Sequence, residues 1–249
     1  MADVATRDFL ARLEALYPEQ AEGAVSPWSL VAATAFSSSN LPEAVPEVFK
    51  YALEGLKTHE QRLLLARKLR DALFKSGMLS GFPKAINALG QLHTAVPNEL
   101  RDVKPLRSVF GNFLALTVLR SFLRSDVSKP VETLAEKGQN YFDRTYGETA
   151  ASVQPFLREI CPDFEFFSTT FAYGYTYSFF DAVSPAETSF TMVAALIAND
   201  TPRQVDWHLR GSVRNGATLD EVKAVRQIAI EVAKASGVKL KNDVPDIHE

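Results

Sequence analysis

The sequence predicts an all-α protein, and three observations carry this prediction. Apolar residues recur at helical spacing along most of the chain, hydroxyl residues stand where helices should begin, and glycine or proline stands where they should end. Hydrophobic residues make up 46% of the 249 residues, which is enough for a substantial core. We therefore expect a single all-α domain that spans residues 1–249.

The first half of the chain contains several amphipathic segments. Apolar residues from Phe9 to Tyr17 recur at helical spacing, and Pro18 ends this helix because proline removes a backbone donor. Ser26-Pro27-Trp28 is typical of a helix start, with proline in the first turn. The strongest pattern runs from Thr58 to Gly77, where Thr58 and Gln61 form a predicted capping box.

Three successive helices in the second half are predicted to open with the same signal, a hydroxyl followed three residues later by an acid or amide. The pairs are Ser184 with Glu187, Thr201 with Gln204, and Thr218 with Glu221. Such a pair satisfies two free amides of the first helical turn reciprocally. Gly216 and Gly237 stand where the second and third of these helices should end, since glycine adopts a left-handed conformation at little cost.

Residues between the halves are predicted to form helices from Val109 to Leu123 and from Val131 to Tyr146. The aromatic segment from Phe164 to Phe180 is ambiguous, because its tyrosines alternate as in a strand whereas its phenylalanines follow a helical period. We expect a helix there, because no other segment offers a partner strand.

A faint internal repeat indicates a duplicated helical unit. Aligning Arg70 with Arg226 also places Ser80-Gly81 on Ser236-Gly237 without a gap. We expect residues 1–108 to form a degenerate N-terminal repeat and residues 109–249 to form the second repeat.

Charge and hydropathy exclude two classes of function. The net charge is −3, with no run of Lys or Arg, so nucleic-acid binding is not expected. No stretch approaches the roughly 18 apolar residues of a membrane span. The N-terminus lacks a secretory signal, and the C-terminal Asp246-Ile247-His248-Glu249 is not a peroxisomal address. We therefore expect a cytoplasmic protein, with a mitochondrial location left open.

Cysteine and histidine usage argues against redox or metal chemistry. The single cysteine, Cys161, forms neither an internal disulfide nor a Cys-x-x-Cys motif, and we expect a buried or incidental thiol. The four histidines are far apart without paired ligand spacing, and there is no Gly-rich phosphate loop. We expect no metal and no cofactor.

Residues 184–238 combine an acid near the start of one helix, a histidine followed by a small residue and Gly216 on the next, and Thr-x-x-Glu at the start of a third. This order resembles the carboxymuconolactone decarboxylase and alkylhydroperoxidase D family. The first half, ending in Gly81 to Leu89, resembles the degenerate N-terminal part of fungal two-repeat members. The resemblance implies an alkylhydroperoxidase D-like helical bundle, a homo-oligomer and a small-molecule substrate.

The sequence departs from the family pattern at its redox motif. Where the peroxidase branch has two cysteines, this chain has Thr201 and Gln204, followed by His208. A peroxidatic cycle needs a reactive thiolate and a resolving thiol, and neither side chain supplies one. Hydroperoxide reduction is therefore disfavoured.

His208 is the candidate general acid or base. We expect Val205, Leu209 and Val213 to form the core stripe of its helix, with His208 beside that stripe and facing a partly buried pocket. The resemblance implies Glu187 as its partner. The alternatives are a packed histidine with a hydrogen-bonding neighbour, and a Glu187 that serves only its capping box.

Four further residues are candidates for substrate binding. Arg210 would bind a carboxylate, while Trp207, Tyr173 and Tyr177 would line an apolar pocket. In the alternative interpretation, Arg210 and Arg214 point to solvent or a subunit interface, and the aromatic residues pack in the core or between subunits. The two hypotheses are a cofactor-free lyase that acts on an unsaturated or lactone-type carboxylic acid, and a catalytically silent oligomeric module of the same fold.

Overall fold

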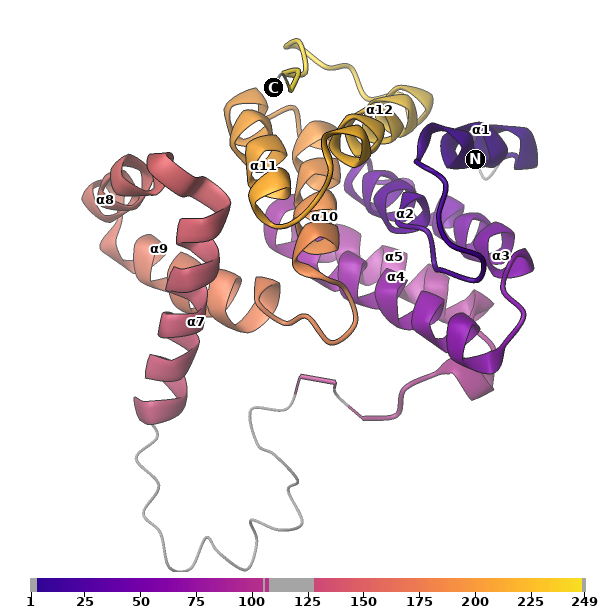
Figure 1. The fold of residues 1–249 in the computed structure, drawn as a ribbon, viewed down its shortest axis with the longest axis horizontal. Coiled ribbons are helices and arrows are strands. Elements are labelled where there is room, and N and C mark those ends of the chain that lie inside the picture. Colours follow the sequence, from indigo (N-terminus) through magenta and orange to yellow (C-terminus); the bar gives the residue numbers. More distant parts are fainter. Residues whose placement is uncertain (1–3, 105, 108–127, 248–249) are drawn as a thin grey trace, which may run out of the picture. The chain divides into compact units, whose positions relative to one another are not determined.

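The computed structural model describes residues 4–104, 106–107 and 128–247, and every regular element in these ranges is a helix (Figure 1). The all-α prediction is confirmed. The predicted helix from Val109 to Leu123 lies outside the described residues. The elements are α1 (Arg7–Leu16), α2 (Trp28–Ser38), η2 (Pro42–Ala44), α3 (Val45–Glu54), α4 (His59–Ser80), α5 (Phe82–Ala95), η3 (Asn98–Leu100), α7 (Ser128–Tyr146), η4 (Gly147–Thr149), α8 (Ala150–Ile160), α9 (Pro162–Phe167), η5 (Ser168–Tyr177), α10 (Pro185–Ala198), α11 (Pro202–Arg214) and α12 (Leu219–Ala235).

Contacts within the chain define two compact units. The first unit comprises Met1–Arg101, Arg144–Gly147 and Phe180–Glu249, and the second comprises Asp102–Asp143 and Glu148–Phe179. This grouping does not follow the predicted boundary between residues 108 and 109. The single domain with two repeats stays a prediction.

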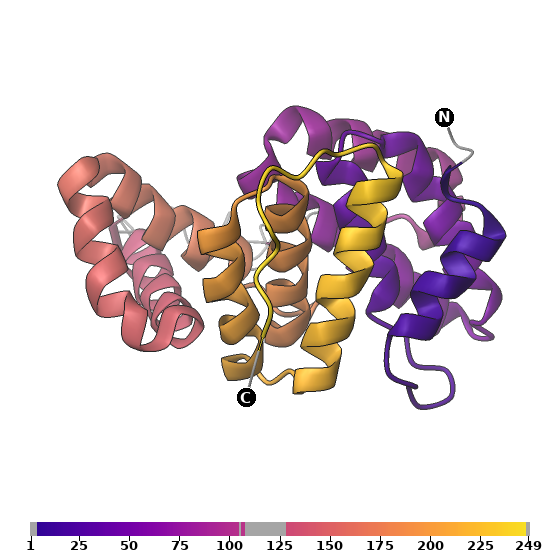
Figure 2. The same cartoon turned by 90° about the horizontal axis from the view of Figure 1, so that it is seen from above.

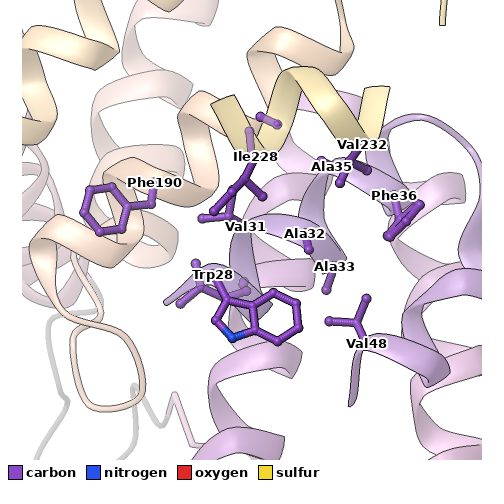
Figure 3. Packing of buried hydrophobic residues seen from close by; sticks show 14 of the residues in the cluster. Trp28, Val31, Ala32, Ala33, Ala35, Phe36, Val48, Phe190, Ile228 and Val232 are labelled. Carbon is purple, nitrogen blue, oxygen red and sulfur yellow. The ribbon is translucent and has the colours of Figure 1, made fainter. Parts of the chain in front are cut away.

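Helix α10 is the centre of the first unit. It packs against α2, α4, α11 and α12, and every residue from Glu187 to Ala198 is buried. Helix α2 is buried along its whole length on another side of the same core. Figure 3 shows Trp28 and Val31 of α2 together with Phe190 of α10 and Ile228 of α12 in this core. Burial of this apolar surface is the main stabilising term of the unit.

The predicted capping boxes are confirmed at three of four positions, and α11 begins at Pro202 as predicted. Capping boxes form at Thr58, Ser184 and Thr218, each closed by the acid or amide three residues later. The capping box predicted at Thr201 is wrong, because this residue has a ψ of 72° where the three capping residues have ψ between 158° and 169°. Its hydroxyl donates to the Leu196 carbonyl at 3.0 Å across the tight α10–α11 turn. Gly216 and Gly237 adopt positive φ after α11 and α12, as predicted.

The connections of α2 to α4 and of α10 to α12 share two local features. The turns after α2 and α10 each contain a non-glycine residue with positive φ, Asn40 and Asp200. The capping boxes of α4 and α12 begin at Thr58 and Thr218. Both pairs are 160 residues apart, whereas the alignment from sequence alone used a spacing of 156. The duplication remains a prediction, and these features favour the longer spacing.

The segment after α12 returns along this helix (Figure 2). Arg226 of α12 donates to the carbonyls of Val244 and Pro245, and Asp200 accepts from the backbone N–H of Lys241 at 2.8 Å. Ile247 is buried in the main hydrophobic cluster. The segment is therefore an integral part of the first unit.

The second unit contains α8, α9, η5 and most of α7. The aromatic segment is helical, as predicted, and Ser168–Tyr177 adopts the wider π-helical geometry. Two glycines allow a close approach of α7 and η5, since a Cβ at Gly138 or Gly174 would overlap the backbone of the facing helix. Cys161, expected to be buried or incidental, is exposed because it lies in the turn between α8 and α9.

Candidate functional site

The predicted acid Glu187 lies in the first turn of α10 and is bound by two partners. Its Oε2 accepts from the backbone N–H of Ser184 at 2.9 Å, which closes the capping box. Its Oε1 forms an ion pair and hydrogen bond with Nζ of Lys68 on α4, and both side chains are largely buried. The carboxylate is therefore held by a cation from the N-terminal half of the chain.

Glu221 at the start of α12 is bound in the same manner. One oxygen accepts from the backbone N–H of Thr218 at 2.8 Å, and the other accepts from the hydroxyl of Tyr17 at 2.9 Å. Burial raises the pKa of Tyr17, and its hydrogen bond to the Glu221 carboxylate raises that pKa further. Tyr17 therefore stays protonated and acts as a donor.

A second buried ion pair lies within α4, and its lysine also reaches α10. Lys75 is fully buried, its Nζ lies 3.2 Å from Oδ2 of Asp71, and it donates to the Thr188 hydroxyl at 2.7 Å. Two charges out of water need well-placed partners to offset their desolvation. Lys68 and Lys75 thus bind consecutive residues of α10, Glu187 and Thr188, and join the two helices by charge as well as by apolar packing.

The predicted acid or base, His208, is sealed inside the first unit with 2% of its surface exposed. Its ring packs edge-on against Tyr146, with centroids 5.5 Å apart. Its Nδ1 has no hydrogen-bond partner among the described residues. Burial lowers the pKa of His208 to about 4, so the imidazole is neutral near pH 7.

The predicted core stripe of α11 is wrong at one position, which explains this burial. Val205 and Leu209 are buried as expected, but Val213 is 43% exposed and Ser212 is buried in its place. The buried face includes Gly211, where a Cβ would approach the Thr145 carbonyl to 2.7 Å. Residues 144–147 pack against this face, so His208 lies under a segment that is distant in sequence.

Glu187 and His208 are not brought together within the chain. Asn215 donates to the Ser189 hydroxyl at 2.9 Å, which places the end of α11 beside the first turns of α10. His208 lies seven residues before Asn215, or roughly 10 Å further along α11 at 1.5 Å per residue. No hydrogen bond or ion pair joins the two side chains in the described structure.

The remaining predicted site residues also have structural partners. Arg210 pairs with Asp206 one turn away at 3.3 Å and has a largely exposed side chain. Trp207 is half-buried between the ring of Tyr146 and the guanidinium of Arg203. Arg214, considered beside Arg210, donates to the Thr145 carbonyl at 3.0 Å. Their predicted role in substrate binding is untested.

Tyr173 and Tyr177 belong to the second unit, where both are buried. Their rings pack against each other with centroids 5.3 Å apart, and Tyr173 also packs edge-on against Phe142 of α7. In the second unit these two tyrosines therefore serve aromatic packing. Among the described residues no three His, Cys, Asp or Glu side chains gather as a metal site.

Sequence reasoning missed Lys68, Asp71, Lys75 and Tyr17. One signal was present, because Lys68, Asp71 and Lys75 recur at i, i+3 and i+7 and therefore share one face of the predicted helix, beside its apolar stripe. A charge beside the apolar stripe of a helix needs a partner from another element. The identity of that partner, more than 100 residues away, is not encoded locally.

Fold and site together define a class: an all-α protein whose central helix carries polar groups that are bound by cations from the N-terminal half. No family model and no solved structure matches the chain. It is 31% identical to Peroxisomal protein 2 of Schizosaccharomyces pombe over 86% of this chain and 89% of that protein. It is 27% identical to Peroxisomal protein 2 of Saccharomyces cerevisiae over 87% of this chain and 91% of that protein. The chain belongs to the Peroxisomal protein 2 family.

These relatives correct one prediction and leave another open. The prediction of a cytoplasmic protein is wrong, because both relatives are named as peroxisomal proteins. The resemblance to the carboxymuconolactone decarboxylase family is unconfirmed, since no family model matches.

The burial of His208 predicts a pH dependence of stability. The pKa is about 4 in the folded chain against an ordinary value of 6.5, so between these pH values the unfolded chain binds the proton and the folded chain does not. The contribution of neutral His208 to the free energy of unfolding is complete above pH 6.5 and is lost as the pH falls towards 4, by roughly 3 kcal/mol in total.

We expect urea titrations at several pH values to show a steeper loss of the free energy of unfolding for wild type than for His208→Gln. His93→Gln, at an exposed position, is the control, and parallel curves for wild type and His208→Gln would contradict the assignment.

Proposed function

We propose that this chain is a peroxisomal helical module that acts by binding and assembly, without acid–base catalysis at His208. The observation that carries this proposal is the sealed imidazole, which is 2% exposed. A general acid or base must come within hydrogen-bond reach of the substrate proton that it transfers. A ring enclosed by α11 and residues 144–147 has no such access.

The surroundings of the two predicted catalytic residues support the same proposal. Glu187 binds Lys68 and the backbone of Ser184, so both of its oxygens have structural partners. Desolvation keeps His208 neutral at physiological pH, and the described structure gives it no carboxylate partner. Together these contacts explain both residues as parts of the fold.

The names of the two relatives support a peroxisomal location. None of the described helices is both long and apolar enough to cross a membrane. We propose that the chain shares the location of its relatives.

The second unit supports a role in assembly. Phe156, Phe164, Phe166, Phe167 and Phe171 each leave between 37% and 53% of their surface exposed. The ring of Phe171 contacts those of Phe166 and Phe167, with centroids 6.0 and 5.8 Å apart. At roughly 200 Å² per ring these residues expose about 450 Å² of apolar surface, which is comparable to the largest apolar patch of a typical monomer and about half of one partner's share of a typical interface.

We expect no turnover above background on a panel of unsaturated and lactone-type carboxylic acids. Wild type, His208→Gln and the exposed control His93→Gln are compared by product analysis, with circular dichroism to establish the fold. Turnover by wild type and by His93→Gln that disappears in a folded His208→Gln would overturn the proposal and favour the lyase.

We expect a fluorescent fusion of the chain to co-localise with a peroxisomal marker in yeast cells. Fusions at either end are compared, because a tag can mask a targeting signal. A diffuse cytoplasmic signal from both fusions would contradict the proposed location.

We expect light scattering after size-exclusion chromatography to give a mass above that of the monomer. The double substitution of Phe164 and Phe167 by serine removes apolar surface from the proposed contact and should shift the mass towards the monomer. Leu64→Ser is the matched control, because Leu64 is 38% exposed in the first unit. A monomeric wild type, or equal masses for all three proteins, would argue against assembly through this face.

A further inference from the structure

Helix α5 of the first unit has an exposed face without formal charge. Phe82 and Ile86 lie one turn apart on this face and expose 55% and 66% of their surface. Lys84 is the only lysine, arginine, aspartate or glutamate of the helix, and it turns away from them to donate to the carbonyl of Ser38 at 2.6 Å. The exposed face of a helix normally carries charged side chains, so an apolar face without them indicates a contact with another surface.

Gly90 lies in the middle of this exposed face, one turn beyond Ile86. Glycine is the least favourable helix residue after proline, so its presence inside a helix needs a reason. A Cβ at each of the other glycines inside the described α- and π-helices would lie 2.9 Å or less from an atom of another segment: Gly77, Gly138, Gly174 and Gly211. A Cβ at Gly90 would meet nothing within 4 Å. Contacts within the chain therefore do not explain Gly90, and a close approach from outside the chain does.

The side chains along this face match one another in size when the helix is reversed. Phe82 and Ile86 occupy the first half of α5, and Gly90 and Thr94 follow at the same spacing of four residues. A two-fold axis perpendicular to α5 sets Ile86 against Gly90 of the second copy, and Phe82 against Thr94 of the second copy. Such self-complementarity is what a symmetric dimer requires. We propose that α5 packs antiparallel against α5 of a second copy of this chain, with Gly90 at the point of closest approach.

The polar groups beside Gly90 favour a second copy over other occupants. The Thr94 hydroxyl already donates to the carbonyl of Gln91 at 2.7 Å, so covering it leaves no donor unpaired. The exposed neighbours Asn87 and Gln91 are uncharged, so two identical faces meet without repulsion. A membrane surface fits less well, because anionic headgroups attract lysine and arginine and this face has neither.

The length of α5 limits the strength of this contact. Its 14 residues extend about 21 Å, and one such helix buries well under the roughly 800 Å² per partner of a standard interface. We therefore expect a weak dimer that dissociates on dilution. This contact goes beyond the proposed assembly through the second unit, because it uses other residues and does not depend on that assembly.

Sedimentation equilibrium over a series of protein concentrations tests the contact. The parent variant carries serine at positions 164 and 167, so that the proposed second-unit contact does not contribute. We expect Gly90→Leu to raise the dissociation constant of the dimer about tenfold or more, because the leucine fills the space taken by Ile86 of the second copy. Adding Ile86→Ala to Gly90→Leu exchanges the large and small residues and should restore the constant to within about threefold of the parent. Ala11→Leu, at an exposed position of α1, is the matched control and should leave it unchanged.

Thermal unfolding separates a lost contact from a damaged fold. Leucine favours a helix more than glycine does and has open space at position 90, so Gly90→Leu should raise the Tm of the dilute protein. A lower Tm would show that another segment of the same chain covers this face and would overturn the proposal. A parent variant that is monomeric at every concentration, an ineffective Gly90→Leu, or no rescue by Ile86→Ala would also overturn it. A monomeric parent variant beside an assembled wild type would leave the second-unit assembly standing.

Discussion

The structure of the first unit depends on the burial of α10 on all sides. A helix in this position must have partners for every polar side chain that it carries, because an unpaired polar group in the core costs on the order of 1–3 kcal/mol. Lys68 binds Glu187, Lys75 binds Thr188, and Asn215 binds Ser189. The hydroxyl of Thr191 donates to the carbonyl of Glu187, one turn earlier in the same helix. The order of polar residues along α10 thus fixes which neighbours lie against it and in which register.

This constraint explains which parts of the fold were predictable from sequence. Capping boxes at Thr58, Ser184 and Thr218 are closed within four residues, so local spacing determines them. The same spacing failed at Thr201, because the tight α10–α11 turn gives this residue a ψ of 72°, unlike that of a capping residue, and its hydroxyl lies against the carbonyl of Leu196. The aromatic segment was predictable as a helix, but its π-helical geometry was not. That geometry accompanies the close approach of Gly138 and Gly174 to facing backbone, which only the tertiary structure defines.

At the candidate site, contacts between residues distant in sequence limited the prediction even more. Glu187 was recognisable as an acid in a capping box, but its partner Lys68 comes from a helix 119 residues away. The burial of His208 likewise follows from the residues that cover it. Val205 and Leu209 are buried on one side of α11, as their spacing predicted. Residues 144–147 lie close to Gly211, and the buried surface of the helix therefore includes His208 and not Val213. A periodic pattern predicts one apolar stripe of a helix, but it does not predict a second surface of the same helix that another segment covers.

The buried ion pairs also bear on the lyase hypothesis. A lactone-type carboxylic acid requires a cation to bind it, yet the cations near Glu187 and Thr188 are engaged in buried ion pairs. Releasing Lys68 or Lys75 for a substrate would leave a buried carboxylate without its cation, at a cost of several kcal/mol. The charges that hold α4 against α10 therefore oppose an anionic substrate at that position.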